Sequence, residues 1–104
     1  MNPSKVVREK VVLLTDLPNV GPSLAGDLQM IGIQTPAQLK GRDPYALFET
    51  LCEVTRQRHD PCVLDVFISV TQFMNGEPPA VWWKFTAERK QALQRLQHQG
   101  NAPR

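Results

Sequence analysis

Cys52, His59 and Cys62 are the residues whose types could bind a metal ion, and they fall within eleven residues of the chain. Paired ligands of structural zinc sites are separated by about two to four residues as a rule. Here six residues separate Cys52 from His59. Both cysteines have aliphatic neighbours, among which a thiol packs as a small apolar side chain. The pattern therefore favours two reduced structural cysteines, and we predict neither a metal nor a cofactor.

The stretch "PPAVWWKFTAERK", residues 78–90, is a second candidate, because aromatic residues and cations alternate in it. Aromatic rings can stack on nucleic-acid bases while neighbouring cations neutralise phosphates. The alternative is that Trp82 and Phe85, three residues apart, fill the core while Trp83 partly covers the surface. We expect at least two of these rings in the core and keep an exposed tryptophan as a possible contact residue.

Catalysis has little support in this sequence. It contains no carboxylate pair with an evident base or nucleophile, no phosphate-binding glycine loop of the Walker type and no serine-centred elbow. Tyr45 and Asp65 are expected to be half-buried hydrogen-bonding residues rather than catalysts. We predict that the protein is not an enzyme.

Prolines placed directly after capping residues mark the expected helix starts, as in Thr35-Pro36, Asp43-Pro44 and Asp60-Pro61. No segment alternates with the period of a strand. We therefore predict a compact all-α domain of five to six helices. These helices are expected at about residues 10–17, 23–31, 36–40, 44–57, 61–74 and 86–99. The segment 61–74 is apolar nearly all round, which makes it the predicted central helix.

The 104-residue chain has an ordinary globular composition, with 41% apolar and 21% charged residues, and we expect a single domain over residues 1–104. Its longest apolar run, "VVLL", is far too short to cross a bilayer, and the N-terminus lacks the features of a signal peptide. We expect a cytoplasmic protein without membrane contact, and a disordered tail over about residues 100–104.

The stretch "LPNVGPSLAGDLQMIGI", residues 17–33, fits the helix-hairpin-helix pattern of a tight turn with glycine, a small residue in the next helix and a final Gly-Ile. We place this hairpin at about residues 13–33. Gly21 is expected to supply backbone freedom such as a positive φ, and Ala25 and Gly26 to let two helices approach closely. Amides at the start of the second helix would then form a phosphate site from backbone alone. Its small core is expected to comprise Leu17, Val20, Leu24, Leu28 and Ile33.

Beyond this motif, the order and spacing of four stretches resemble a bacterial pathogenicity-locus family of small proteins, some of them labelled mitomycin-resistance proteins. The stretches are "LPNVGPSLAGDLQMIGI", "LKGRDPYALFETLC", "DPCVLDVFISVTQF" and "WWKFTAERK", within residues 13–90. The resemblance implies a helix-hairpin-helix fold and a link to DNA, but no known activity. A looser similarity is to the C-terminal domains of bacterial competence regulators, which carry the same hairpin.

The hairpin departs from strong DNA-binding hairpins at two positions. Asn19 replaces a glycine of the usual turn, which it can do because asparagine tolerates the left-handed conformation. Ser23 stands where such hairpins often carry Lys or Arg, and no basic residue occurs from Val11 to Leu39. Phosphate affinity depends largely on cations, so the hairpin alone should bind DNA weakly. The net charge of +2 permits contact with a polyanion without demanding it.

We therefore predict non-specific DNA binding through backbone phosphates, with cations supplied from outside the hairpin. Arg56 and Arg58 would join the basic residues near the C-terminus if the last helix folds back over the domain. The expected hairpin contacts are Asn19, Val20, Gly21, Ser23 and Leu24. The expected basic patch comprises Arg56, Arg58, Lys84, Arg89 and Lys90. The alternative is a protein–protein interaction module that uses the uncharged hairpin face "NVGPSL". The sequence leaves the oligomeric state and the choice between DNA and RNA open.

Overall fold

A computed structural model describes residues 6–101, with side chains described through residue 95. Within this range the chain forms α-helices and short 3-10 segments and no β-strand, which confirms the predicted all-α fold. The α-helices are α1 (Pro22–Met30), α2 (Pro44–Thr55), α3 (Pro61–Met74) and α4 (Thr86–Asn101). The 3-10 segments are η2 (Arg8–Lys10), η3 (Leu14–Asp16), η4 (Pro36–Leu39) and η5 (Trp82–Phe85).

The described α-helices are four rather than the expected five or six, because two of the expected helices are 3-10 turns. Over residues 10–17, the Asp16 carboxylate accepts hydrogen bonds from the Val12 and Leu13 amides and closes a local turn. An Asp side chain that bonds nearby amides in this way competes with α-helix formation. The same hydrogen bonds lower the pKa of Asp16, with the Leu13 amide contributing most. Over residues 36–40, η4 ends where Gly41 takes a positive φ of 77°.

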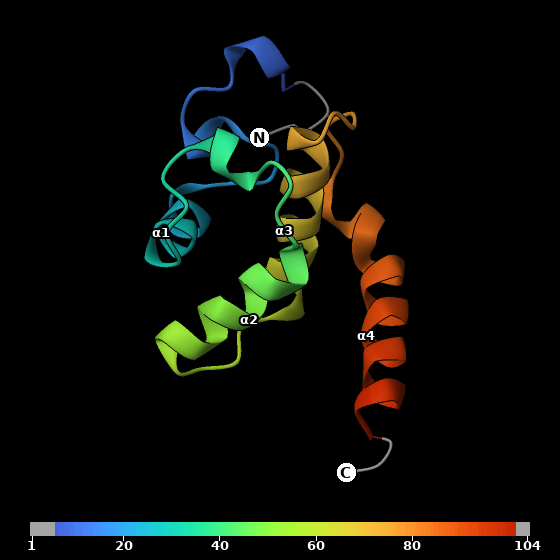
Figure 1. Ribbon diagram of the computed structural model, residues 1–104. Helices are drawn as coiled ribbons and strands as arrows, with labels where there is room; N and C mark the ends of the chain where they lie inside the picture. Colours follow the sequence, from blue (N-terminus) through green and yellow to red (C-terminus); the bar gives the residue numbers. More distant parts are fainter. Residues whose placement is uncertain (1–5, 102–104) are drawn as a thin grey trace.

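Helix α3 is the central element, with α1 on one side of it and α4 on the other (Figure 1). Asp60 caps it by accepting from the Cys62 amide at 2.8 Å, and Pro61 occupies its first turn. Its side chains Leu64, Phe67 and Phe73 are at most 1% exposed. This confirms the prediction that residues 61–74 form the central buried helix.

Helix α2 packs against α3 and contributes buried Leu47, Phe48 and Leu51 to the core. It begins at an Asp43 cap that accepts from the Tyr45 amide. It ends at Arg56, whose φ of 55° is left-handed and uncommon for a residue with a side chain. This reversal leads the chain through residues 57–60 directly into α3.

The hairpin turn between η3 and α1 uses a different residue for its left-handed position than expected. Asn19 has a φ of 68°, whereas Gly21 is extended with a φ of −97°. The expectation of a positive φ at Gly21 is therefore wrong, because Asn19 already reverses the chain. No atom from another element lies within 4 Å of the position that a Cβ would take on Gly26, so Gly26 does not mediate a close helix contact as expected.

The small core predicted for residues 13–33 is largely present. Four of its five members have no exposed surface: Leu17, Val20, Leu28 and Ile33. The fifth, Leu24, is half-buried and packs against the core.

Helix α4 follows η5 and runs along the side of the molecule opposite α1 (Figure 1). Of the η5 rings, Phe85 is buried, Trp82 is half-buried and Trp83 is 61% exposed. The prediction that at least two of the three rings join the core, leaving one exposed tryptophan, is confirmed. Helix α4 continues to Asn101, and the rest of the predicted disordered tail lies outside the described residues.

Candidate functional site

A cleft of about 590 Å³ lies between the start of α1 and the start of α3. Helix α1 forms one wall, the residues that connect α2 to α3 form another, and a half-buried tryptophan before α4 completes it. Its size falls within the roughly 300–1,000 Å³ typical of ligand sites. The lining residues are Asn19, Ser23, Leu24, Asp27, Gln57, His59, Asp60, Cys62, Val63, Val66 and Trp82.

The hairpin turn is fixed at the edge of this cleft by the Asn19 side chain. Its Nδ2 donates to the Ala80 carbonyl oxygen at 2.7 Å and to the Ser69 hydroxyl at 3.2 Å. One amide therefore ties the turn to the middle of α3 and to the segment that precedes η5. Three segments far apart in the sequence are held together at this point.

The cleft combines apolar walls with acidic groups. Leu24, Val63 and Val66 give it aliphatic surface, and Trp82 adds an indole that packs edge-to-face on Trp83, with 5.6 Å between ring centroids. Asp27 of α1 and Asp60 before α3 add carboxylates, and no Lys or Arg lines the cleft. In the part of the chain with described side chains, no Lys or Arg nitrogen lies within 4.0 Å of either carboxylate.

Cys62 lies in the cleft as a half-buried free thiol beside Asp60. A hydrogen bond to the Asp60 carboxylate, followed by burial, raises the pKa of the Cys62 thiol. The same contact, after that of the Cys62 amide, lowers the pKa of Asp60. A thiol held in its protonated form is a poor nucleophile, so this arrangement does not activate Cys62.

The other members of the candidate metal set are held apart in the structure. Cys52 is buried in the core, and His59 Nε2 lies 2.8 Å from the Thr55 hydroxyl. The Thr55 hydroxyl also lies 2.8 Å from the Leu51 carbonyl oxygen, so these contacts hold His59 beside the end of α2. Among the residues that the structure describes, no group of three His, Cys, Asp or Glu side chains is placed to hold a metal ion.

The predicted hairpin contacts divide into residues that hold the turn and residues that face outward. The Asn19 side chain is used internally and Val20 has no exposed surface, so neither presents a side chain to a large ligand. Gly21 and Leu24 are half-buried and Ser23 is exposed. The first main-chain hydrogen bond of α1 runs from the Ala25 amide to the Gly21 carbonyl oxygen, so the preceding amides of Ser23 and Leu24 can serve an outside acceptor.

Arg89 and Arg58, both expected in the basic patch, are already paired within the molecule. Arg89 Nε donates to Asp65 Oδ1 at 2.9 Å and its Nη2 to Oδ2 at 3.3 Å, and the two side chains are 11% and 0% exposed. Thr86 donates to the same carboxylate at 2.8 Å. Arg58 pairs with Glu49 at 3.0 Å on the surface, where both side chains are more than half exposed. Arg89 thus joins α4 to α3 instead of facing solvent.

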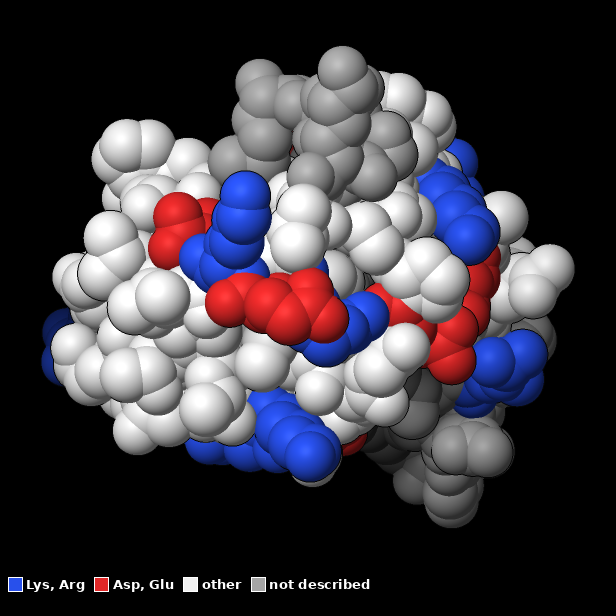
Figure 2. Space-filling view, turned by 90° about the horizontal axis from the view of Figure 1, so that it is seen from above, with Lys and Arg blue, Asp and Glu red and all other residues white. Residues whose placement is uncertain are grey.

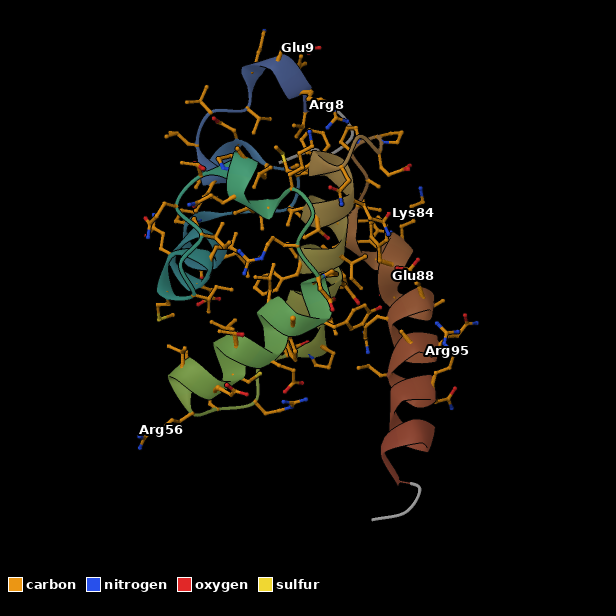
Figure 3. The ribbon with its side chains drawn as sticks, viewed as in Figure 1. Arg8, Glu9, Arg56, Lys84, Glu88 and Arg95 are labelled. Carbon is orange, nitrogen blue, oxygen red and sulfur yellow. The ribbon has the colours of Figure 1, made fainter. Side chains whose placement is uncertain are left out.

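The remaining basic residues do not gather beside the hairpin. Arg56 lies at the far end of α2 and Lys84 beside the start of α4, on opposite sides of the view in Figure 3. Lys90 is an exposed residue of α4. Seen from above, Lys and Arg occupy separate places with Asp and Glu between some of them (Figure 2). The structure does not bring the five expected basic residues together on one face.

The cleft was not predicted from the sequence. Its walls come from positions up to about sixty residues apart, and only the fold brings them together. The nearest signal was Asp27, an acidic residue in a hairpin that was expected to meet phosphate. Within the described range, the chain has no helix whose length and apolar character would let it cross a membrane.

Comparison with known proteins places these features in a family. The model of the Cdd1 family, described as "pathogenicity locus", matches residues 7–91. The chain is 45% identical over 80 residues to a protein of Streptomyces lavendulae named mitomycin resistance protein McrB, a match that covers 77% of this chain and 76% of that protein. No solved structure gives a significant match. The match to the family model, which takes in the hairpin, α2, α3 and the Trp82–Phe85 segment, shows that the chain belongs to the Cdd1 pathogenicity-locus family.

Proposed function

We propose that this chain is a non-enzymatic, cytoplasmic interaction module that docks a protein partner at the cleft beside the hairpin. In this proposal, residues 13–33 form a helix-hairpin-helix motif whose first helix is reduced to η3. The observation that carries the proposal is the lining of the cleft, where the start of α1 faces apolar and acidic side chains instead of cations.

The distribution of charge supports protein docking over phosphate binding as the main function. Non-specific DNA affinity comes chiefly from cations that neutralise phosphates. Of the five basic residues considered, Arg89 is paired with buried Asp65 and is only 11% exposed, and Arg58 is paired with Glu49. Asp27 and Asp60 would repel a phosphate that approached through the cleft. A cleft that combines aliphatic, aromatic and acidic side chains suits a protein segment better.

Site-directed photocrosslinking in the native host tests the docking proposal. A photoreactive residue replaces exposed Ser23 at the cleft, or exposed Gln91 on α4 as the matched control. We expect a discrete protein adduct from position 23 alone. Leu24→Glu in the cleft should remove this adduct, whereas Val54→Glu, at a residue that is 53% exposed on α2, should leave it. Equal adducts from both positions, or insensitivity to Leu24→Glu, would contradict docking at the cleft.

Weak DNA binding is the second candidate function, favoured by the open amides of Ser23 and Leu24 at the start of α1. Arg56, Lys84 and Lys90 would supply attraction at longer range. The name of the Streptomyces relative, a resistance protein, is compatible with either function.

Fluorescence anisotropy with double- and single-stranded DNA at low and physiological salt tests this second function. We expect any binding to fall steeply with salt and to weaken more when Arg56, Lys84 and Lys90 are all changed to Gln than with Ser23→Ala. No binding at low salt, or equal losses in the two variants, would exclude it. Arg89 is left unchanged in this comparison because its loss would perturb the fold.

A further inference from the structure

We infer that the partner segment inserts a Lys or Arg side chain into the cleft, with its charge near Asp27 and Asp60 and its aliphatic stem on Trp82 and Leu24. The inference rests on the proposed docking function and specifies its chemistry. It begins from the difference between these two carboxylates, which have no cation from the described side chains, and Asp65 of α3, which has one.

The two carboxylates enter one cleft from different elements, Asp27 from α1 and Asp60 from the residue before α3. Asp27 is half-buried, so it has already lost part of its hydration. The nearby Asp65, which is fully buried, receives a bidentate Arg and a Thr hydroxyl from its own chain. No Lys or Arg side chain within residues 6–95 forms an ion pair with Asp27. A cation from a partner would supply that pair.

The partial positive charges at the N-termini of α1 and α3 reduce the negative charge of the two carboxylates without cancelling it. Each helix N-terminus is equivalent to about +0.5 of an elementary charge, so two of them contribute roughly +1. The two carboxylates contribute about −2, which leaves the cleft negative by about one charge. The Cys62 amide holds the pKa of Asp60 below its ordinary value, which already leaves an aspartate ionised at neutral pH.

The apolar part of the lining selects among cations. A Lys or Arg side chain carries three or four methylenes that pack on aliphatic and aromatic surface while the charged end stays near polar groups. Trp82 is half-buried in the wall, and an indole face attracts a guanidinium or ammonium group. A metal ion or a hydrated inorganic cation would gain nothing from Leu24, Val63 and Val66. The lining therefore points to a long organic cation beside an aliphatic residue, as a peptide supplies.

Three short peptides test this inference directly: acetyl-Leu-Arg-Leu-amide, its citrulline counterpart and its glutamate counterpart. Citrulline keeps the shape of arginine but lacks its charge. The Trp83→Phe variant serves as the parent, since Trp83 is 61% exposed and its removal leaves Trp82 as the single tryptophan. Binding is followed by Trp82 fluorescence and by amide chemical shifts at residues 23–27 and 57–66.

We expect the Arg peptide to bind about three- to tenfold more tightly than the citrulline peptide, and the Glu peptide to bind least. Asp27→Asn should reduce the preference for Arg over citrulline, while Glu53→Gln, at an exposed residue of α2 outside the cleft, should not. Chemical shifts outside the cleft, equal binding of the Arg and citrulline peptides, or no binding by any peptide would overturn the inference. Equal binding would leave docking itself intact, and a missing adduct at position 23 would instead count against the proposed function.

Discussion

Carboxylates occur in two regions at α3, and only one of these regions pairs its carboxylate with a cation from the described part of the chain. At the junction with α4, Asp65 is fully buried and its oxygens accept from Arg89 and Thr86. At the cleft, Asp27 and Asp60 line an open space without a cation from the described side chains. The first region satisfies its charge within the fold, and the second leaves it facing outward.

The difference separates a basic residue that stabilises the fold from a cleft in which the described side chains supply no cation. A buried carboxylate must be paired, since an isolated charge in the interior is very costly. Arg89 meets that need and so is lost to any surface that could attract phosphate. The cleft carboxylates keep contact with solvent, since Asp60 is exposed and Asp27 is half-buried, and they do not require a cation from within the fold. Their charge is then available to a partner.

The largest effect is expected from breaking the junction with Arg89→Ala. Leaving Asp65 buried without its cation should lower the free energy of unfolding by about 3–5 kcal/mol. A domain of this size has about 5–15 kcal/mol in total, so the variant should unfold at much lower urea concentration. Circular dichroism during urea denaturation measures the loss.

Two further variants show whether this loss comes from the buried charge. Asp65→Leu combined with Arg89→Met removes both charges and should recover most of the stability. Arg58→Ala breaks a surface pair and should cost less than about 1 kcal/mol. If Arg89→Ala were no more harmful than Arg58→Ala, the contrast between the two regions would be lost.

A smaller effect is expected at the cleft edge from variants of Asn19. Asn19→Gly keeps the left-handed backbone but removes the hydrogen bonds to Ser69 and Ala80, with an expected loss of about 1–2 kcal/mol. Asn19→Ala adds the strain of a positive φ and should lose about 1 kcal/mol more. Urea denaturation of both variants gives the two contributions separately. Equal stability of the Gly and Ala variants would show that the turn does not depend on the left-handed residue.

Much of the fold could be predicted because its signals are local. The Asp-Pro pairs at residues 43–44 and 60–61 mark the starts of α2 and α3, and the apolar composition of 61–74 identifies the buried helix. The family resemblance expected from the hairpin, α2 and α3 is confirmed. The helix expected at 10–17 failed because the Asp16 side chain bonds two amides beside it, a competition that apolar patterning does not reveal.

The site was harder to predict because it depends on pairs of residues far apart in the sequence. Arg89 looked like a surface cation until Asp65, twenty-four positions earlier, was found against it. Asn19 was expected at a ligand, yet its amide reaches Ala80 across sixty-one positions. Charge counts along the chain cannot separate cations used inside from cations left outside. A buried Asp in an otherwise apolar helix was the one available sign that a basic partner was needed.

The smallest effect is expected at Asp60, where the cleft carboxylate controls a thiol. Asp60→Asn keeps an oxygen to cap α3 but removes the charge that helps to raise the pKa of Cys62. Alkylation of Cys62 by iodoacetamide at pH 7.5 should therefore be slow in the parent and faster in Asp60→Asn, because only the thiolate reacts. Mass spectrometry distinguishes Cys62 from Cys52, which is buried and serves as the internal control.

The contact between Asp60 and Cys62 also predicts how stability changes at low pH. Because folding lowers the pKa of Asp60, this carboxylate contributes stability above its ordinary pKa of about 3.9, and the contribution is lost as pH falls through the lowered value. In Asp60→Asn this part of the acid dependence should disappear, while the part due to Asp16, whose pKa is also lowered, should remain. An unchanged alkylation rate and an unchanged acid dependence in Asp60→Asn would mean that the Asp60 charge acts on neither Cys62 nor α3. Asp60 would then make no stabilising interaction through its charge, in contrast to Asp65, whose charge is paired with Arg89.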